Sequence, residues 1–298
     1  MLHGLLDDLR RLSDAADSPL VPGTGAAGVV VACGNHATRF RRGDRVSCES
    51  WFGGLAERMV AKESKTAFLP ANVDFIVGST ILHTYLTAWY ALIERAQLQA
   101  GETVLVTGAA GGVGLACVEV AHLLGARIIA VVGSAAKAAI VKYGAEEVVD
   151  YSREDVRQRV KAFTGDEGLD VCVENVGGTL FTTLARLMRW NGRLTPIGFT
   201  SGEVPSLAMN LPLLRNYSIV GVFTGAWTER FPDDPSRAAR GAITAALTHA
   251  TRRGSGLLLL GALSSSTSLE LLARGPEQDF VHINLLRLAH GEGDCPRE

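Results

Sequence analysis

The stretch Val104-Leu-Val-Thr-Gly108-Ala-Ala-Gly111-Gly112-Val-Gly114 decides the fold. Its apolar start predicts a strand that runs into a glycine-rich turn and directly on into a helix. Gly111 lets the backbone approach a pyrophosphate, Gly114 permits close helix packing, and the helix N-terminus offers unpaired N–H groups. Ala109 replaces the first glycine of the usual fingerprint, so the match to the strict template is imperfect. In this strand and helix context, the turn predicts a dinucleotide-binding site.

The residues that follow the turn alternate regularly between strand and helix patterns. Apolar runs predict strands at 103–107, 127–132, 147–149, 169–174, 193–198 and 218–223. Helical spacing predicts helices at 112–124, 135–143, 154–163 and 180–190. Repeated βαβ units with short connections are typical of a parallel, doubly wound sheet, so the fold class is α/β.

The segments on either side of this alternating region have different sequence patterns. Leucines at helical spacing predict a short amphipathic helix at 2–12, and strand signals punctuated by glycine follow at 28–32, 44–48 and 56–60. One or two buried helices are expected over 77–96. Beyond residue 230, only 238–253 has a helical pattern. Residues 264–298 show no convincing alternation of strand and helix patterns.

Composition limits the functional classes. A chain of 298 residues with 47% hydrophobic content is long enough for two domains. The net charge of −2, with acids and bases interspersed, argues against nucleic acid as a partner. The five cysteines have neither metal-ligand nor disulfide spacing, which indicates a reducing, cytoplasmic location. The N-terminus does not read as a secretion signal, and the longest apolar run, 256–263, is too short to span a membrane.

The choice of dinucleotide depends on the end of the second strand of the alternating region, which reads Val132-Gly133-Ser134. An acidic residue there would bind the ribose 2′-hydroxyl and repel a 2′-phosphate, and none is present. Lys137 lies close by as a candidate phosphate partner, so NADPH is favoured over NADH. The alternative for Lys137 is a solvated surface lysine. Tyr151 either flanks the adenosine or caps the core.

In these residues, the chain resembles the medium-chain dehydrogenase/reductase superfamily. Within it, the chain is most similar to the zinc-independent NADPH:quinone oxidoreductases related to zeta-crystallin. Besides the glycine-rich turn, six motifs carry the resemblance in family order over residues 19–230: Val21-Pro-Gly23, Gly43-Asp-Arg-Val46, Gly53-Gly-Leu-Ala-Glu57, Thr87-Ala-Trp-Tyr-Ala-Leu92, Asn175-Val-Gly-Gly178 and Gly192-Arg-Leu-Thr-Pro-Ile-Gly-Phe199.

The resemblance implies a Rossmann doubly wound sheet plus a partial GroES-like, β-rich catalytic domain, with the active site between the two domains and a homodimeric assembly. We expect a truncated GroES-like domain at 1–90, the NADPH-binding domain at 91–230 and an atypical segment at 231–298. The resemblance also implies which residues bind NADPH. They are Thr87, Ala110, Gly111, Gly112, Val113, Ser134, Lys137, Tyr151, Val176, Gly177, Gly198, Phe199 and Phe223.

No metal site is expected. Zinc members of the superfamily carry a Gly-His-Glu motif where this chain has Gly23-Thr24-Gly25, and they have a cysteine-rich lobe that is not found here. His36 and His83 stand alone, without partners at ligand spacing.

The resemblance implies hydride transfer from NADPH to a quinone or an α,β-unsaturated carbonyl. The family's Asn-bearing catalytic stretch is missing because the match begins at about Pro19, so no catalytic residue is assigned. Gly25 also replaces a glutamate of related reductases, and the family's closing strand is not recognisable within 254–298. Two alternatives remain open: a catalytically impaired NADPH-binding remnant or sensor, and an enoyl-thioester reductase of the same superfamily.

Overall fold

The computed structural model describes residues 21–142, 144–231 and 280–285. These residues fall into two compact units, which we describe separately. One holds residues 83–231, and the other holds residues 21–82 together with strand β11 (Phe280–Leu285). The helix at 2–12 and the helix at 238–253 that the sequence predicts lie outside the described residues.

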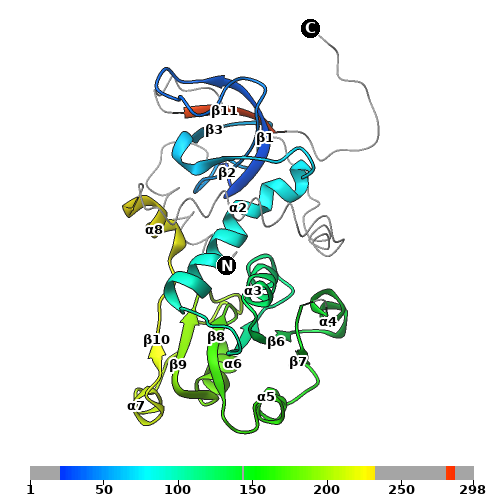
Figure 1. The fold of residues 1–298 in the computed structure, drawn as a ribbon, viewed down its shortest axis with the longest axis vertical. Coiled ribbons are helices and arrows are strands. Elements are labelled where there is room, and N and C mark those ends of the chain that lie inside the picture. The colour runs from blue at the N-terminus through cyan, green and yellow to red at the C-terminus, as the bar shows by residue number, and fades with distance from the viewer. Residues whose placement is uncertain (1–20, 143, 232–279, 286–298) are drawn as a thin grey trace. The chain divides into compact units, whose positions relative to one another are not determined.

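The larger unit is built on a six-stranded sheet in the order β10-β9-β8-β5-β6-β7 (Figure 1). Every neighbouring pair is parallel. This order reverses between β5 and β8, which makes that crevice the topological switch point of a doubly wound sheet. The predicted Rossmann architecture is therefore confirmed. The strands are β5 (Thr103–Thr107), β6 (Arg127–Val132), β7 (Glu147–Asp150), β8 (Leu169–Glu174), β9 (Met188–Pro196) and β10 (Ser218–Ile219).

Helices connect these strands and cover the sheet. They are α3 (Gly112–Leu123), α4 (Ala135–Val141), α5 (Val156–Thr164) and α6 (Gly178–Ala185). Their ends follow local chemistry: Ser134 caps α4 and Asp155 caps α5 with side-chain oxygens, and Gly165 ends α5 in the left-handed conformation. Residues of β5, β6, β8 and β9 form a fully buried core that includes Leu105, Ile129 and Leu194. This core fixes the strand ends where the predicted site lies.

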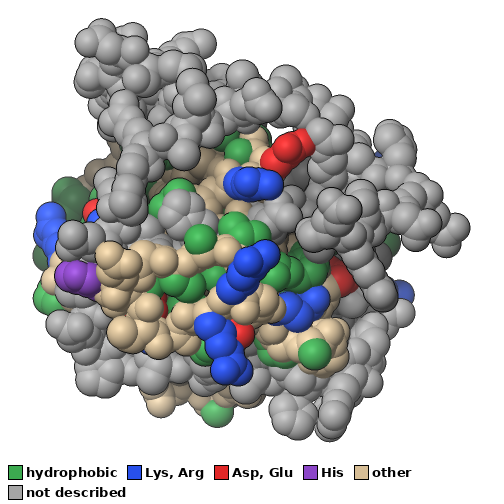
Figure 2. Space-filling view, turned by 90° about the horizontal axis from the view of Figure 1, so that it is seen from above, with side chains coloured by type: hydrophobic (Ala, Val, Ile, Leu, Met, Phe, Trp, Pro, Cys, Tyr) green, Lys and Arg blue, Asp and Glu red, His purple; other side chains and the backbone are tan. Residues whose placement is uncertain are grey.

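The smaller unit is a five-stranded antiparallel sheet in the order β3-β11-β1-β2-β4. Its strands are β1 (Gly25–Cys33), β2 (Arg45–Glu49), β3 (Arg58–Lys62), β4 (Thr66–Phe68) and β11. A cluster of buried side chains, among them Val30, Val46 and Ile283, packs on one face. The predicted β-rich second unit is thus confirmed. In Figure 2, Lys and Arg side chains on the visible face stand among hydrophobic and uncharged atoms.

Strand β11 is the main departure from the sequence expectation. The sequence showed no convincing alternation over 264–298, yet residues 280–285 form a strand between β1 and β3. The side chain of Ile283 is completely buried in the antiparallel core. The family's closing strand was not recognisable in the sequence over 254–298, and β11 shows that the chain does return to this sheet.

Two predicted elements are shorter than expected. Helix α6 ends at Ala185, and residues 188–190, predicted as helix, begin β9, because Met188 is fully buried and pairs with Leu169. The strand predicted at 218–223 reduces to β10, since α8 (Thr224–Arg230) begins soon after it. The sequence reading also did not include α7 (Asn210–Arg215), α8 or β4.

The helical region expected over 77–96 forms α2 (Phe75–Trp89), which continues as a π-helical segment, Tyr90–Arg95. Together they make a helix of 21 residues that is long and apolar enough to cross a membrane by length and composition alone. Slightly more than half of its apolar window, 56%, is buried inside the protein. A core helix passes the same test, so the expected absence of a membrane partner remains a prediction.

Candidate functional site: a dinucleotide cradle

The glycine-rich turn has the geometry that an anion cradle requires. Gly108 takes the left-handed conformation with φ of 58°, and the Gly111 N–H donates to its carbonyl oxygen at 2.9 Å. A Cβ at Gly114 would stand 2.2 Å from that same oxygen, so only glycine allows α3 to lie this close to the turn. Helix α3 begins directly after exposed Gly111, and no side chain caps it. The first N–H groups of α3 are therefore available to a phosphate.

Ala109, the departure from the glycine fingerprint, has a structural explanation. It is completely buried, and its N–H donates to the Val131 carbonyl at 3.2 Å. The residue faces the sheet rather than a ligand, so its methyl group does not obstruct the cradle. Of the predicted phosphate contacts, Ala110 and Gly112 are half-buried and Val113 is buried at 7% exposure.

The residues predicted for the adenosine end lie together after β6 and β7. Ser134 is the N-cap of α4 and accepts from the Lys137 N–H at 3.4 Å, while the Lys137 side chain is exposed. Tyr151 follows β7, and its N–H donates to the Val132 carbonyl at 3.0 Å. Its hydroxyl would stand 2.8 Å from a Cβ at Gly133, so glycine is needed there. At 43% exposure, the Tyr151 ring does not cap the core, so its place beside the adenosine remains a prediction.

The residues predicted for the nicotinamide end follow β8, β9 and β10. Val176 and Gly177 come directly after β8, and Gly198 and Phe199 follow β9. The Phe199 ring would stand 3.1 Å from a Cβ at Gly177, so these two loops are in contact. Phe223 follows β10 and is 66% exposed. The carboxyl ends of six parallel strands thus bring twelve of the thirteen predicted residues to one edge of the sheet.

Thr87, the remaining predicted residue, lies on α2. Its hydroxyl donates to the His83 carbonyl within the same helix at 2.7 Å, and the residue is 8% exposed. Thr84, one turn earlier, comes closer to the cradle, since its methyl group would stand 3.1 Å from a Cβ at Gly112. Sequence reasoning missed Thr84, although the helical spacing from Thr87 placed both residues on neighbouring turns.

A buried polar network at the switch point was also missed. Glu174, the last residue of β8, is completely buried, and its carboxylate accepts from the Thr107 hydroxyl at 3.0 Å. The same carboxylate accepts from the N–H groups of Val176 and Gly177, each at 2.9 Å. Burial raises the pKa of Glu174, although hydrogen bonds from Val176, Thr107 and Gly177 oppose the rise. The sequence signal for this network was Glu174 itself, a charged residue at the end of an otherwise apolar strand.

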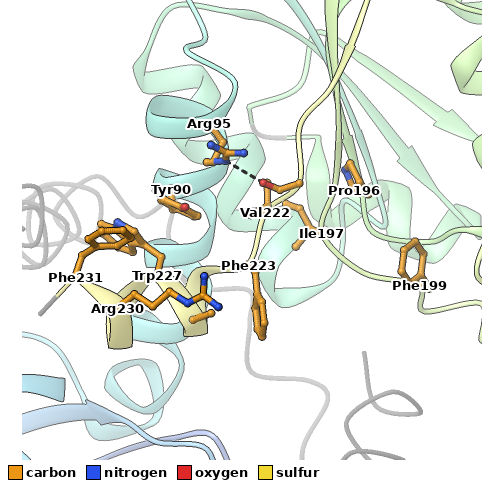
Figure 3. Close-up of a pocket in the computed structure, with 12 residues that line it drawn as sticks. Tyr90, Arg95, Pro196, Ile197, Phe199, Val222, Phe223, Trp227, Arg230 and Phe231 are labelled. Carbon is orange, nitrogen blue, oxygen red and sulfur yellow. Dashed lines mark hydrogen bonds between the residues drawn. The ribbon is translucent and has the colours of Figure 1, made fainter. Parts of the chain in front are cut away.

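An aromatic pocket of about 670 Å³ lies beside the ends of β9 and β10 (Figure 3). Tyr90 and Trp227 stack with ring centroids 4.6 Å apart and hold α8 against the π-helical segment. Arg95 donates to the Gly221 carbonyl at 2.9 Å, which ties the same segment to the chain after β10. The lining includes Phe199 and Phe223, two of the predicted nicotinamide-end residues.

Three of the four described cysteines lie in the interior of the protein. Cys48, Cys117 and Cys172 are buried, and burial raises the pKa of the Cys48 and Cys117 thiols to about 12. Over residues 21–142, 144–231 and 280–285, no group of three or more His, Cys, Asp or Glu residues is placed to hold a metal ion. The expectation of a zinc-free protein remains a prediction.

The chain matches known protein families over most of its length. A family model described as "Alcohol dehydrogenase GroES-like domain" matches residues 6–87, and one described as "Zinc-binding dehydrogenase" matches residues 112–240. A quinone oxidoreductase-like protein 2 homolog from Nematostella vectensis is 36% identical over 231 residues, which are 76% of this chain and 63% of the relative. The family match begins at residue 6, earlier than the expected start at Pro19.

Two solved structures are similar along most of the chain. A mycobacterial quinone oxidoreductase aligns with a TM-score of 0.67 and 30% identity, over 80% of this chain and 74% of the other. An Escherichia coli quinone oxidoreductase complexed with NADPH aligns with a TM-score of 0.70 and 27% identity, over 80% of this chain and 72% of the other.

A doubly wound parallel sheet with a glycine-rich turn, joined in one chain to an antiparallel β unit, defines an alcohol dehydrogenase-like oxidoreductase fold. More narrowly, the chain belongs to the zeta-crystallin-like quinone oxidoreductase family of the medium-chain dehydrogenase/reductase superfamily. It spans 63% of the length of the Nematostella relative.

Proposed function

We propose that this protein binds NADPH and reduces a quinone or an α,β-unsaturated carbonyl. The observation that carries the proposal is the uncapped N-terminus of α3 behind Gly111, set at the switch point of a doubly wound sheet. The residues present fit a dinucleotide, because glycine at position 114 lets the N-terminal end of α3 lie directly behind the turn at Gly108. When bound, NADPH would supply the hydride.

Recognition of the 2′-phosphate rests on the end of β6. Ser134 and Lys137 share the first turn of α4, and no acidic residue stands among Val132, Gly133 and Ser134 to repel a phosphate. The exposed Lys137 ammonium supplies a positive charge there, and the Tyr151 hydroxyl lies over Gly133. This arrangement supports NADPH over NADH, and the similar E. coli enzyme was solved with NADPH.

The acceptor class rests on the aromatic pocket. Phe199 and Phe223 line it at the ends of β9 and β10, where the family resemblance places the nicotinamide. Aromatic walls favour a flat, conjugated acceptor. They also exclude water from one side of it. We assign no residue to the polarisation of the acceptor oxygen.

The test is a titration of the purified protein with NADPH and NADH, followed by addition of a simple quinone. Tighter binding of NADPH and its oxidation on adding quinone would support the proposal. If the protein bound NADPH but no quinone or enone oxidised it, the protein would instead be a cofactor-binding remnant or sensor. Oxidation only with an enoyl thioester would identify the third candidate, an enoyl-thioester reductase. If neither cofactor bound, the proposal would fail.

We also propose that the protein forms a homodimer. Strand β10 ends the parallel sheet, so its outer side has no partner strand in the described part of the chain. Ile219 on this strand and Leu213 and Leu214 on α7 are exposed, at 44%, 78% and 70%. Sedimentation of the native protein should give a dimer, and Leu214→Lys should shift it toward monomer without lowering thermal stability. A monomeric native protein would contradict the proposal.

A further inference from the structure

The aromatic pocket beside β9 and β10 carries charge of one sign. Its charged lining residues are two arginines, Arg95 from the π-helical segment and Arg230 from the end of α8. Arg95 Nε donates to the Gly221 carbonyl at 2.9 Å, and the two terminal nitrogens of Arg95 have no partner among the described residues. Arg230 is exposed and makes no hydrogen bond or ion pair with those residues. Glu94 and Glu229, the acidic neighbours in sequence, do not line the pocket.

The fold determines where the Arg230 side chain lies. Trp227 is 7% exposed, and its ring stacks on Tyr90 with the centroids 4.6 Å apart. Arg230 comes three residues later on α8, so both side chains lie on the same face of that helix. Figure 3 shows the Arg230 guanidinium extending from α8 toward Phe223, which lines the same pocket. The positive charge is therefore held beside the aromatic wall at the predicted nicotinamide end.

The anionic groups of the cofactor are expected elsewhere. The pyrophosphate is expected at the cradle after β5, and the 2′-phosphate at Lys137 after β6. In the sheet, β9 lies two strands and β10 three strands from β5, on the side away from β6. Neighbouring strands are about 4.8 Å apart, so the ends of β9 and β10 lie roughly 10 and 14 Å from that of β5. Salt largely screens charges over such distances, which leaves the two arginines to another anion.

The walls and the arginines of this pocket select different parts of one ligand. The rings of Tyr90, Phe199 and Phe223 favour a flat, conjugated system. A guanidinium is planar, always charged and has paired N–H donors that match the two oxygens of a carboxylate. A neutral quinone would contact the aromatic rings and leave both guanidiniums to water. An acidic quinone or enone would use the rings and the charge together.

We propose that the acceptor is acidic, a flat, conjugated carbonyl compound whose carboxylate binds Arg230. This inference rests on the proposed function. The acceptor gains a hydride from NADPH and a proton from water, so that a quinone becomes a hydroquinone and NADPH becomes NADP⁺. The carboxylate keeps all its bonds in this reaction. Arg230 is thus a specificity-determining residue, and Arg95 adds positive charge to the same pocket.

The first test measures binding to the full chain without cofactor or turnover. The probes are 2-naphthoate and 2-naphthamide, which are both flat, have nearly the same shape and differ in charge. Calorimetry should show that 2-naphthoate binds roughly 3- to 10-fold more tightly, as expected for a charged hydrogen bond at an exposed arginine. Arg230→Gln should abolish this difference, and Arg230→Lys, which keeps the charge, should retain part of it. Arg186→Gln, at an exposed arginine after α6, is the matched control and should leave it unchanged.

The second test measures oxidation of NADPH by a benzoquinone that carries a propionate side chain and by the methyl ester of the same quinone. The native protein should favour the acid by roughly 3- to 10-fold in kcat/KM, chiefly through a lower KM, because the carboxylate lies outside the reacting bonds. Arg230→Gln should bring the ratio of acid to ester close to one. High salt should lower the same ratio in the native protein.

The two tests separate this inference from the proposed function. If the native protein showed no preference for the acid in either test, or if the preference survived Arg230→Gln, the inference would be overturned. Reduction of the ester would still uphold the proposed function in that case. If the protein reduced neither quinone with NADPH, the proposed function would fail, and the acidic acceptor would fail with it.

Discussion

At the scale of single residues, Lys137 tests the preference for NADPH. We expect Lys137→Ala to weaken NADPH by roughly 10-fold, since a hydrogen bond to a charged group is lost, and to leave NADH within about 2-fold. Equilibrium titration with both cofactors measures the difference. Lys142→Ala removes another exposed lysine just after α4 and serves as the matched control. Equal losses for NADPH and NADH would refute the 2′-phosphate role.

Glu174 gives a second residue-level prediction, through the dependence of stability on pH. Because burial raises its pKa in the folded state above the ordinary 4.5, the folded protein holds this proton more tightly than the unfolded chain. Its contribution to stability is therefore complete below pH 4.5 and is lost as the pH rises through the folded-state pKa. Urea unfolding across this range should show that the stability advantage of native protein over Glu174→Gln shrinks as the pH rises.

Glu102 provides the contrast for that measurement. Burial opposes ionisation of Glu102, but the Arg193 guanidinium and the Gln99 N–H outweigh it and lower the pKa of Glu102. The pH dependence of stability is then reversed. The contribution of Glu102 to stability is present above its ordinary pKa and is lost as the pH falls through the lowered pKa. Relative to the native protein, Glu102→Gln should therefore show its largest loss of stability at neutral pH. The same pH trend in both variants would contradict this account.

The candidate site was predictable from sequence where backbone geometry dictates residue type. Gly108 takes a positive φ and Gly114 has no room for a Cβ, and both requirements are visible in the sequence. Glu174 was not predicted as a site residue because its contacts depend on Thr107, which lies on another strand. No spacing rule reveals a contact between residues so far apart in the chain.

At the scale of secondary structure elements, Gly25 fixes the approach of β1 to α2. A Cβ there would stand 2.6 Å from the Ser79 carbonyl oxygen, so a side chain at this position would clash with the backbone of α2. Gly25→Ala should destabilise the protein by about 1–3 kcal/mol through overpacking, measured by urea unfolding. Gly221→Ala is the control, since nothing lies within 4 Å of a Cβ at that position. Equal stability of both variants would contradict the close approach.

Element boundaries show what local pattern can predict. Strands β5, β6 and β8 have the predicted bounds, because continuous apolar runs between short turns are typical of buried strands of a parallel sheet. Residues 188–190 were wrongly predicted as helix, since the pairing of Met188 with Leu169 of β8 outweighs their helical spacing. Strand β11 escaped prediction because its pairing partners, β1 and β3, lie far from it in the chain.

At the scale of the whole molecule, β11 ties the antiparallel sheet together. Ile283→Ala should cost about 2–5 kcal/mol, because it removes a fully buried side chain from the core of that unit. Ile76→Ala, at 37% exposure in the same unit, should cost clearly less. Chemical denaturation compares the two. Similar losses would mean that β11 does not complete the core.

The position of β11 also has a consequence for biosynthesis. Strands β1 and β3 are made before the parallel unit, but the strand that pairs with both is made after it. The parallel unit is contiguous over 83–231 and has all its strands much earlier. Until then β1 and β3 present open edges, which are templates for pairing with other chains. A nascent chain of this protein is therefore expected to need chaperone protection until β11 has been made.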